Sequence, residues 1–213
     1  MNEINAENLF DLEKSIAGEK LGALEYPWQA LSLLEDWIIE LGNQLSPDDF
    51  TQIAENIWVA KNAKVAVTAS LNGPLIVGAG SEIRHGAFIR GNVIIGSDCV
   101  IGNATEVKNS LLFDGVQIPH FNYIGDSILG HKAHLGAGAV IANTRSDHGK
   151  VMVRWGDRVV ATELYKMGAM VGDRVEVGCN AVICPGTIVG RGATIYPLTM
   201  VKGLVTGGSV VQR

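Results

Sequence analysis

The stretch from Val59 to Phe113 reads VAKNAKVAVTASLNGPLIVGAGSEIRHGAFIRGNVIIGSDCVIGNATEVKNSLLF, and every sixth residue in it is aliphatic or aromatic. The pattern continues from Ile118 after a slip of one residue and slips again at Leu129. After a break it runs from Val171 to Val201, and glycine often follows the apolar residue. A period of six residues is a sequence signature of parallel β-helices.

Each hexad is expected to form a short strand and a corner, with its apolar residue pointing inward. Three hexads make one triangular coil, and successive coils stack at about 4.8 Å. The twenty-one hexads therefore predict an all-β fold, a parallel β-helix of about seven coils. Residues 143–168 interrupt the pattern, which predicts a loop near 144–168 that leaves the coil. Long loops in compact domains are usually functional.

Residues 1–52 differ from the rest of the chain. Residues 1–50 hold eleven acidic and two basic residues, whereas residues 51–213 hold eleven acidic and fifteen basic ones. Apolar residues recur there at helical spacing, and Pro27 suits the first turn of a second helix. Because the ends of a solenoid need caps, we predict a helical N-terminal segment over 1–52 that caps the first coil, followed by the β-helix domain over 53–213.

The composition limits the classes of function. No run of about 20 apolar residues is present, so we expect no membrane-spanning segment. The polar, acidic start does not resemble a secretory signal, and we expect a cytoplasmic protein. The mildly basic β-helix domain suits a small anionic ligand better than nucleic acid, which needs a denser basic stripe. The three cysteines form no CxxC motif and are expected to be packing residues.

Four residues carry chemistry that the coil itself does not need. Arg90 and Lys108 are eighteen residues apart, which places two cations about one strand spacing from each other. Like charges on adjacent strands repel, and a bound phosphate would relieve this repulsion; two solvated cations are the alternative. His120 and Tyr123 lie at the first slip, where a bulge re-aims side chains. His120 suits proton transfer, although a surface histidine is the alternative.

A metal site is the competing hypothesis for the histidines. His85 and His120 share a phase of the repeat. Some hexapeptide proteins, the gamma-class carbonic anhydrases, bind zinc with three histidines between subunits, the third coming five residues after the second. Gly125 stands at that position, and the pair His131 and His134 has the wrong spacing. We therefore expect no metal in a catalytic role.

The segments GNATEVKNS (102–110), HFNYIGD (120–126) and IANTR (141–145) together resemble a known family. They are similar to the acetyltransferase half of the bifunctional sugar-1-phosphate nucleotidylyltransferase/glucosamine-1-phosphate N-acetyltransferases, in the archaeal-type variant. The resemblance spans roughly 59–205. It implies a left-handed β-helix, a homotrimer with active sites between neighbouring subunits, and acetyl-CoA as co-substrate.

The resemblance also implies roles for individual residues. Arg90 and Lys108 match two cations that hold the sugar phosphate, and His120 matches the general base. Tyr123 matches a tyrosine that helps to place the amino sugar. Asn143 matches an asparagine near the reacting amine.

Other positions match the family less closely. Lys150 falls near a further phosphate-binding lysine, and Lys166 and Ala169 are candidates for lining the CoA groove. His134 stands where the family has an asparagine and is assigned to substrate binding. Residues 144–145 are Thr and Arg where the family has Tyr and Asp.

The predicted function is acetyl transfer from acetyl-CoA to the amine of a hexosamine 1-phosphate, glucosamine 1-phosphate or an epimer, in sugar-nucleotide biosynthesis. Nothing in residues 1–50 could form the family's nucleotidylyltransferase domain, so a separate nucleotidylyltransferase is a candidate partner. The alternative is a non-catalytic trimer that binds sugar phosphate or CoA and engages such an enzyme through its N-terminal segment.

Overall fold

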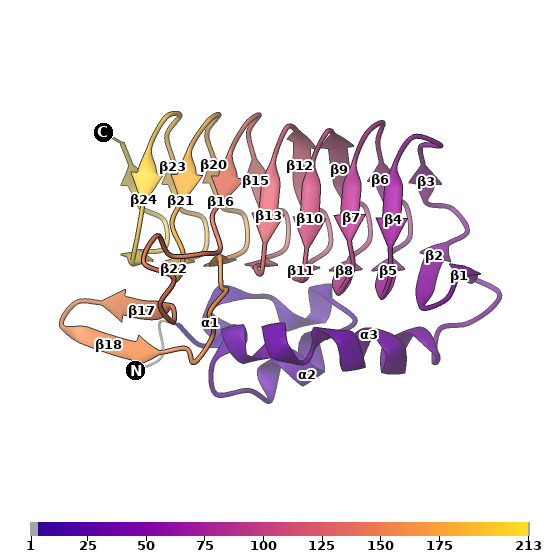
Figure 1. Cartoon of the computed structure of the whole chain (residues 1–213), viewed down its shortest axis with the longest axis horizontal. Coiled ribbons are helices and arrows are strands. Elements are labelled where there is room, and N and C mark those ends of the chain that lie inside the picture. Colours follow the sequence, from indigo (N-terminus) through magenta and orange to yellow (C-terminus); the bar gives the residue numbers. More distant parts are fainter. Residues whose placement is uncertain (1–3, 213) are drawn as a thin grey trace.

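The computed structural model describes residues 4–212. The chain winds into a triangular solenoid, and each coil contributes strands to three sheets (Figure 1). Sheet A comprises β1 (Phe50–Ala54), β2 (Ile57–Ala60), β5 (Leu75–Val77), β8 (Val93–Ile95), β11 (Ser110–Leu112), β14 (Ile128–Leu129), β19 (Ala169–Val171), β22 (Thr187–Val189) and β25 (Leu204–Val205). Sheet B comprises β3 (Lys64–Val65), β6 (Glu82–Ile83), β9 (Val100–Asn103), β12 (Gln117–His120), β15 (His134–Leu135), β20 (Glu176–Val177), β23 (Thr194–Ile195) and β26 (Val210–Val211). Sheet C comprises β4 (Ser70–Asn72), β7 (Phe88–Arg90), β10 (Glu106–Lys108), β13 (Tyr123–Gly125), β16 (Val140–Ile141), β21 (Val182–Ile183) and β24 (Met200–Val201).

The predicted all-β, left-handed parallel β-helix is confirmed, with one more coil than the seven predicted. Sheet A has nine strands, of which only β1 is antiparallel to its neighbour. The extra coil arises after Val201, where a step of four residues leads to Val205 and a full hexad leads on to Val211. A count that requires steps of six stops at Val201 and misses these strands.

The steps between inward-facing residues shorten at one corner of the solenoid. Val107 is followed by Leu112 in the interior, and Ile124 is followed by Leu129, so both steps are five residues long. Both lie at the corner between sheets C and A, which we call the C–A corner. Two successive coils are therefore one residue shorter at this corner than the hexad pattern requires.

These short steps correct two predictions. Phe113 does not point into the solenoid but lies outside it, where its ring stacks on Phe10 with the centroids 5.2 Å apart. Ile118 and Ile124 are a full hexad apart and both lie in the interior. The prediction that His120 and Tyr123 lie at a phase slip is therefore wrong, and His120 occupies a regular corner between sheets B and C.

The N-terminal helices lie along sheet A rather than over the end of the first coil (Figure 1). They are α1 (Ala6–Leu9), the 3-10 helix η1 (Leu12–Lys14), α2 (Gly18–Gly22), the 3-10 helix η2 (Pro27–Ser32) and α3 (Leu34–Gly42). The strands of sheet A are apolar on both faces, so their outward residues must also be covered. Ile76, Ile94 and Ile128 are such residues, and they share a buried cluster with Trp28 and Leu34. Because this outer apolar row must be buried, the N-terminal helices cover the side of the solenoid along sheet A and do not cap the first coil as predicted.

The excursion leaves the coil after β16 and returns at β19. It contains an antiparallel hairpin of β17 (Met152–Trp155) and β18 (Arg158–Ala161), which projects beside the helices (Figure 1). Val151, Val153 and Met167 anchor the excursion in the buried cluster that covers sheet A. Within the described part of the chain, no helix is long and apolar enough to cross a membrane.

Candidate active site

The two predicted cations lie on neighbouring strands at the outer surface of sheet C. Val107 in β10 pairs with Ile89 in β7, so Lys108 follows directly beside Arg90. Each cation has a carboxylate partner from a strand or corner further along the solenoid. Arg90 Nη1 is 2.6 Å from Glu106 Oε1, whereas Lys108 Nζ is 3.2 Å from the Oδ2 atom of Asp126. The carboxylates of Glu106 and Asp126 thus offset the repulsion between the two cations that the sequence predicted.

The carboxylate of Asp126 accepts hydrogen bonds from three side chains at the C–A corner. Its Oδ1 accepts a hydrogen bond of 2.9 Å from Asn109 Nδ2. Its Oδ2 accepts from Lys108 Nζ and from Asn143 Nδ2. The Asp126 side chain is 6% exposed and that of Lys108 is 20% exposed. A buried carboxylate with three donors holds its neighbours in fixed places.

Tyr123 and Asn143 join the same cluster. Asn143 hydrogen-bonds the Tyr123 hydroxyl, and a Cβ atom built on Gly125 would lie 2.7 Å from both the hydroxyl oxygen and Asn143 Nδ2. A side chain at position 125 would therefore displace one of these two groups. Burial raises the pKa of Tyr123, and the nearby carboxylates of Asp126 and Glu106 raise it further. The phenol thus stays neutral and can donate a hydrogen bond to an anionic ligand.

His120 lies just before the strand that carries Tyr123. It ends β12 at the corner between sheets B and C and is exposed. Its backbone N–H donates to Asn122 Oδ1 at 3.1 Å, and the following residue, Phe121, is 62% exposed. The structure therefore brings Arg90, Lys108, Tyr123 and Asn143 together on sheet C and its C–A corner, and sets His120 on the adjoining corner.

Three other predicted residues lie away from this cluster. His134 Nδ1 is 2.8 Å from Glu176 Oε2 on sheet B. Lys150 forms an ion pair with Glu163 at the base of the hairpin. Lys166 is exposed and its backbone bridges to that of Thr144. None of these contacts belongs to the cluster around Asp126.

Ala169 cannot line a cofactor groove with its side chain. The residue is fully buried in the interior of the solenoid, and its backbone N–H donates to Ser127 Oγ at 3.1 Å. Its place in β19 is the inward position of sheet A, which explains why a small apolar residue stands there. The assignment of the Ala169 side chain to CoA binding is corrected accordingly.

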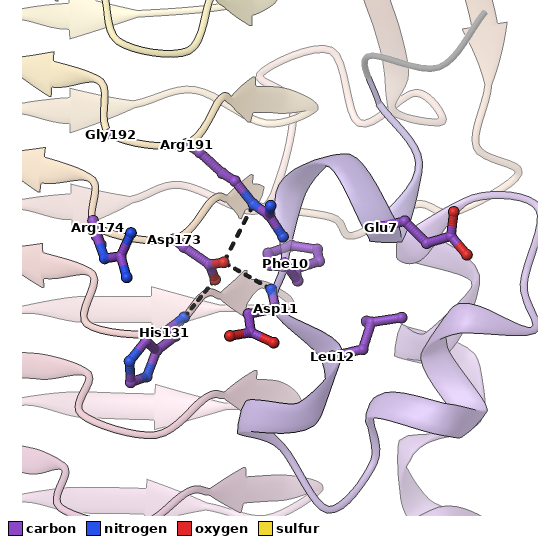
Figure 2. Close-up of a pocket in the computed structure, with 9 residues that line it drawn as sticks. All are labelled: Glu7, Phe10, Asp11, Leu12, His131, Asp173, Arg174, Arg191 and Gly192. Atoms are coloured by element: carbon purple, nitrogen blue, oxygen red, sulfur yellow. Dashed lines mark hydrogen bonds and ion pairs between the residues drawn. The ribbon is translucent and has the colours of Figure 1, made fainter.

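A cavity of about 590 Å³ lies elsewhere, where the N-terminal segment meets the corner between sheets A and B (Figure 2). Asp173 stands at its centre and accepts backbone N–H groups of Asp11 and His131 at 2.7 and 2.8 Å, while Arg191 Nε is 3.2 Å away. Burial raises the pKa of Asp173, and these donors oppose the shift. The cavity contains no predicted site residue, and Asp173 joins the N-terminal segment to the solenoid.

Sequence reasoning missed three residues of the cluster, Glu106, Asn109 and Asp126. The first and third are the acids that face the predicted cations. The signal that could have found them is the pair of five-residue steps, because a shortened corner brings polar side chains of successive coils together. In residues 4–212, no three His, Cys, Asp or Glu side chains lie close enough to form a metal site.

Comparison with known proteins places this architecture in a family. Residues 71–165 match the model of the GMPPB C-terminal domain. A putative uncharacterized acetyltransferase of Escherichia coli K12, YaiX, is 30% identical over 218 residues, which cover 93% of this chain and 92% of that protein. This chain belongs to the hexapeptide-repeat acyltransferases.

Other relatives of this hexapeptide-repeat acyltransferase are longer. The bifunctional sugar-1-phosphate nucleotidylyltransferase/acetyltransferase of Sulfurisphaera tokodaii is 32% identical over 188 residues, covering 79% of this chain and 47% of that protein. The chain thus spans about half the length of the first curated relatives that it matches. Among solved structures, the acetyltransferase domain of PglB from Neisseria gonorrhoeae in complex with acetyl coenzyme A aligns with a TM-score of 0.38 and 18% identity, over 81% of this chain and 72% of that one.

Proposed function

We propose that the protein transfers an acetyl group from acetyl-CoA to the amine of a hexosamine 1-phosphate, glucosamine 1-phosphate or an epimer, in sugar-nucleotide biosynthesis. The observation that carries the proposal is the pair of adjacent cations, Arg90 and Lys108, with Tyr123 and Asn143 on the same surface. Two cations and a neutral phenol are the donors that a phosphate monoester prefers. The S. tokodaii relative, named as acting on sugar 1-phosphates, supports this class of substrate.

The chemistry assigns one task to each residue. An amine is mostly protonated at neutral pH and becomes a nucleophile only after losing a proton. His120, exposed at the adjoining corner, accepts a proton from the amine as its nitrogen attacks the thioester carbonyl. The C–S bond then breaks and CoA leaves as a thiolate, which takes up a proton. General bases of this kind contribute about 10²–10⁴-fold to the rate. Arg90 and Lys108 hold the phosphate, and the fixed orientation lowers the barrier further.

A second subunit completes the site in this proposal. A triangular prism has flat faces, and His120 lies on its edge beside the exposed Phe121. We propose a cyclic homotrimer in which His134, Lys150 and Lys166 of one chain face the cluster around Asp126 of its neighbour. Acetyl-CoA would lie between two solenoids, close to the excursion over 144–168. A separate nucleotidylyltransferase would then use the acetylated sugar phosphate.

One observation favours the non-catalytic alternative. Both cations are already paired with carboxylates, and Arg145, a departure from the family pattern, is locked in an ion pair with Asp147. A sugar phosphate would engage Arg90 and Lys108 with or without turnover, so the Arg145 pair is the contact that bears on this alternative. The two functions differ in one measurable product, the free thiol of CoA.

The test is a thiol-release assay with acetyl-CoA and a panel of amino-sugar 1-phosphates. The proposal predicts release that depends on both substrates and yields an N-acetylated sugar phosphate by mass spectrometry. Equilibrium binding without thiol release would support the non-catalytic trimer. Acetylation of a hydroxyl group, or of sugars without a phosphate, would contradict the proposed substrate.

A further inference from the structure

We propose that Asp126 is the positioning residue of this site, and that Asn109 ties Asp126 to the N-terminal helical segment. The inference rests on the proposed function, because it names what holds the phosphate-binding lysine and the amide beside the reacting amine. Asp126 itself touches neither substrate. It acts through Lys108 and Asn143, both of which donate to its Oδ2 atom.

The surroundings of Asp126 are built around its charge. The side chain is 6% exposed, and both carboxylate oxygens have side-chain donors. Removing the charge would leave the Lys108 ammonium without its buried counter-ion. An uncompensated buried charge is strongly destabilising, so the lysine would turn toward water. The carboxylate thus decides where the Lys108 ammonium stands.

The backbone of Asp126 also belongs to this arrangement. Its φ is +49°, and that of Asn109 in the preceding coil is +44°. Such left-handed conformations are tolerated by Asn and Asp better than by most other residues. The Asp126 carbonyl accepts the N–H of Gly168 at 2.8 Å, where the excursion returns to the coil. The backbone of Asp126 therefore binds the end of the excursion at Gly168. Its side chain binds the start of the excursion at Asn143.

Asn109 extends the network to the helices. Its Nδ2 donates both to Asp126 Oδ1 at 2.9 Å and to the backbone carbonyl of Leu31 at 3.2 Å. Leu31 lies in η2, which is part of the cover on sheet A. A single amide thus joins the N-terminal segment to the carboxylate behind Lys108. The segment contributes to the site through this contact as well as covering sheet A.

The experiment compares Asp126→Asn with a matched control. Asparagine at position 126 keeps one acceptor oxygen, sets an NH2 group against at least one of the three donors and has no charge. We expect the KM for glucosamine 1-phosphate to rise about tenfold or more, with the KM for acetyl-CoA unchanged. Asp173→Asn removes a carboxylate that is equally buried, at 8% exposure, from the corner between sheets A and B. We expect this control to lower the melting temperature and leave both KM values unchanged.

Asn109→Ala provides a second variant in case Asp126→Asn does not fold. It keeps the Asp126 charge and removes one donor and the contact with Leu31. The expected result is a smaller rise, about threefold to tenfold, confined to the KM for the sugar phosphate. Equal KM values in wild type and Asn109→Ala would overturn the role given to the N-terminal segment.

The outcomes separate this inference from the proposed function. If wild type turns over but Asp126→Asn has unchanged kinetics, or loses affinity for both substrates in parallel with its melting temperature, the positioning role is overturned. If wild type releases no thiol, the proposed function fails, and titration with inorganic phosphate then tests Asp126 directly. Phosphate affinity that falls at least tenfold in Asp126→Asn but not in Asp173→Asn supports positioning; equal affinity overturns it.

Discussion

At the scale of single residues, the charges on sheet C form an alternating series. Arg90 pairs with Glu106, and Lys108 pairs with Asp126. The sequence predicted the cations because they stand eighteen residues apart, but it did not show the acids as their partners. The difference matters for binding, because a phosphate that enters this surface must share each cation with a carboxylate that is already in place.

His120 gives a direct test at this scale. His120→Asn keeps size and polarity but removes basicity, so kcat should fall about 10²–10⁴-fold with little change in either KM. The acidic limb of the kcat/KM profile should disappear with the base. His85→Ala is the matched control, since His85 stands at the same corner two coils earlier, where it contacts Thr68. A His120→Asn variant with near-native turnover would reject the general-base role.

Cys99 gives a pH-dependent prediction. Burial raises the pKa of its thiol from 9.0 to about 12 in the folded chain. Below pH 9 the thiol is protonated in both the folded and the unfolded chain, so the full stability that the raised pKa provides is present. As the pH rises from 9 toward 12, the unfolded chain loses the proton first, so stability falls by about 1.4 kcal/mol per pH unit from this group.

Urea unfolding at pH 8 and pH 10.5 measures this loss. Between pH 8 and pH 10.5, the free energy of unfolding of Cys99→Ala should fall by about 2 kcal/mol less than that of wild type. The reason is that pH 10.5 lies 1.5 pH units above the unfolded pKa of 9.0. Cys179→Ala is the control, because it removes an exposed cysteine and leaves the buried Cys99 thiol in place. The same dependence in wild type and Cys99→Ala would show that the buried thiol does not ionise on unfolding.

At the scale of elements, the hexad pattern predicts the strands but not their positions everywhere. Strand β11 contains Leu111 and Leu112, and Phe113 follows it. Because these three consecutive residues are all apolar, the periodicity cannot decide which one points inward. Sheet A is buried on both faces, which removes the polar alternation that would otherwise set the register. The slip at Leu129, which contains Asp126, is visible in the sequence, whereas the position of the first slip is not, for this reason.

The cover on sheet A predicts a large effect at one aromatic contact. Phe10 is 1% exposed and stacks on Phe113, so Phe10→Ala should destabilise the protein by about 3–5 kcal/mol in urea unfolding. Ile16→Ala in the same segment is the control, since Ile16 is 49% exposed and should change stability by less than about 0.5 kcal/mol. Equal effects of the two changes would mean that the segment is not packed on the solenoid in solution.

At the scale of the whole molecule, the three outer faces differ. Helices cover sheet A, whereas the outer surfaces of sheets B and C carry all the predicted site residues except Asn143, Lys150, Lys166 and Ala169. The proposed trimer would bring these two open faces of neighbouring subunits together. Light scattering should therefore give a mass of about three times 22.7 kDa. A fully active monomer would contradict a shared site.

The central claim is that Lys108, beside Arg90, binds the phosphate of an amino sugar. Its most direct test is the KM for glucosamine 1-phosphate in Lys108→Ala, with Lys202→Ala as control. Lys202 follows Val201 at the C–A corner as Lys108 follows Val107, four strands further along sheet C. Loss of one charge-assisted contact costs about 1.5–3 kcal/mol, so the KM should rise about 10- to 150-fold in Lys108→Ala and stay unchanged in Lys202→Ala. An unchanged KM in a folded Lys108→Ala protein would contradict the claim.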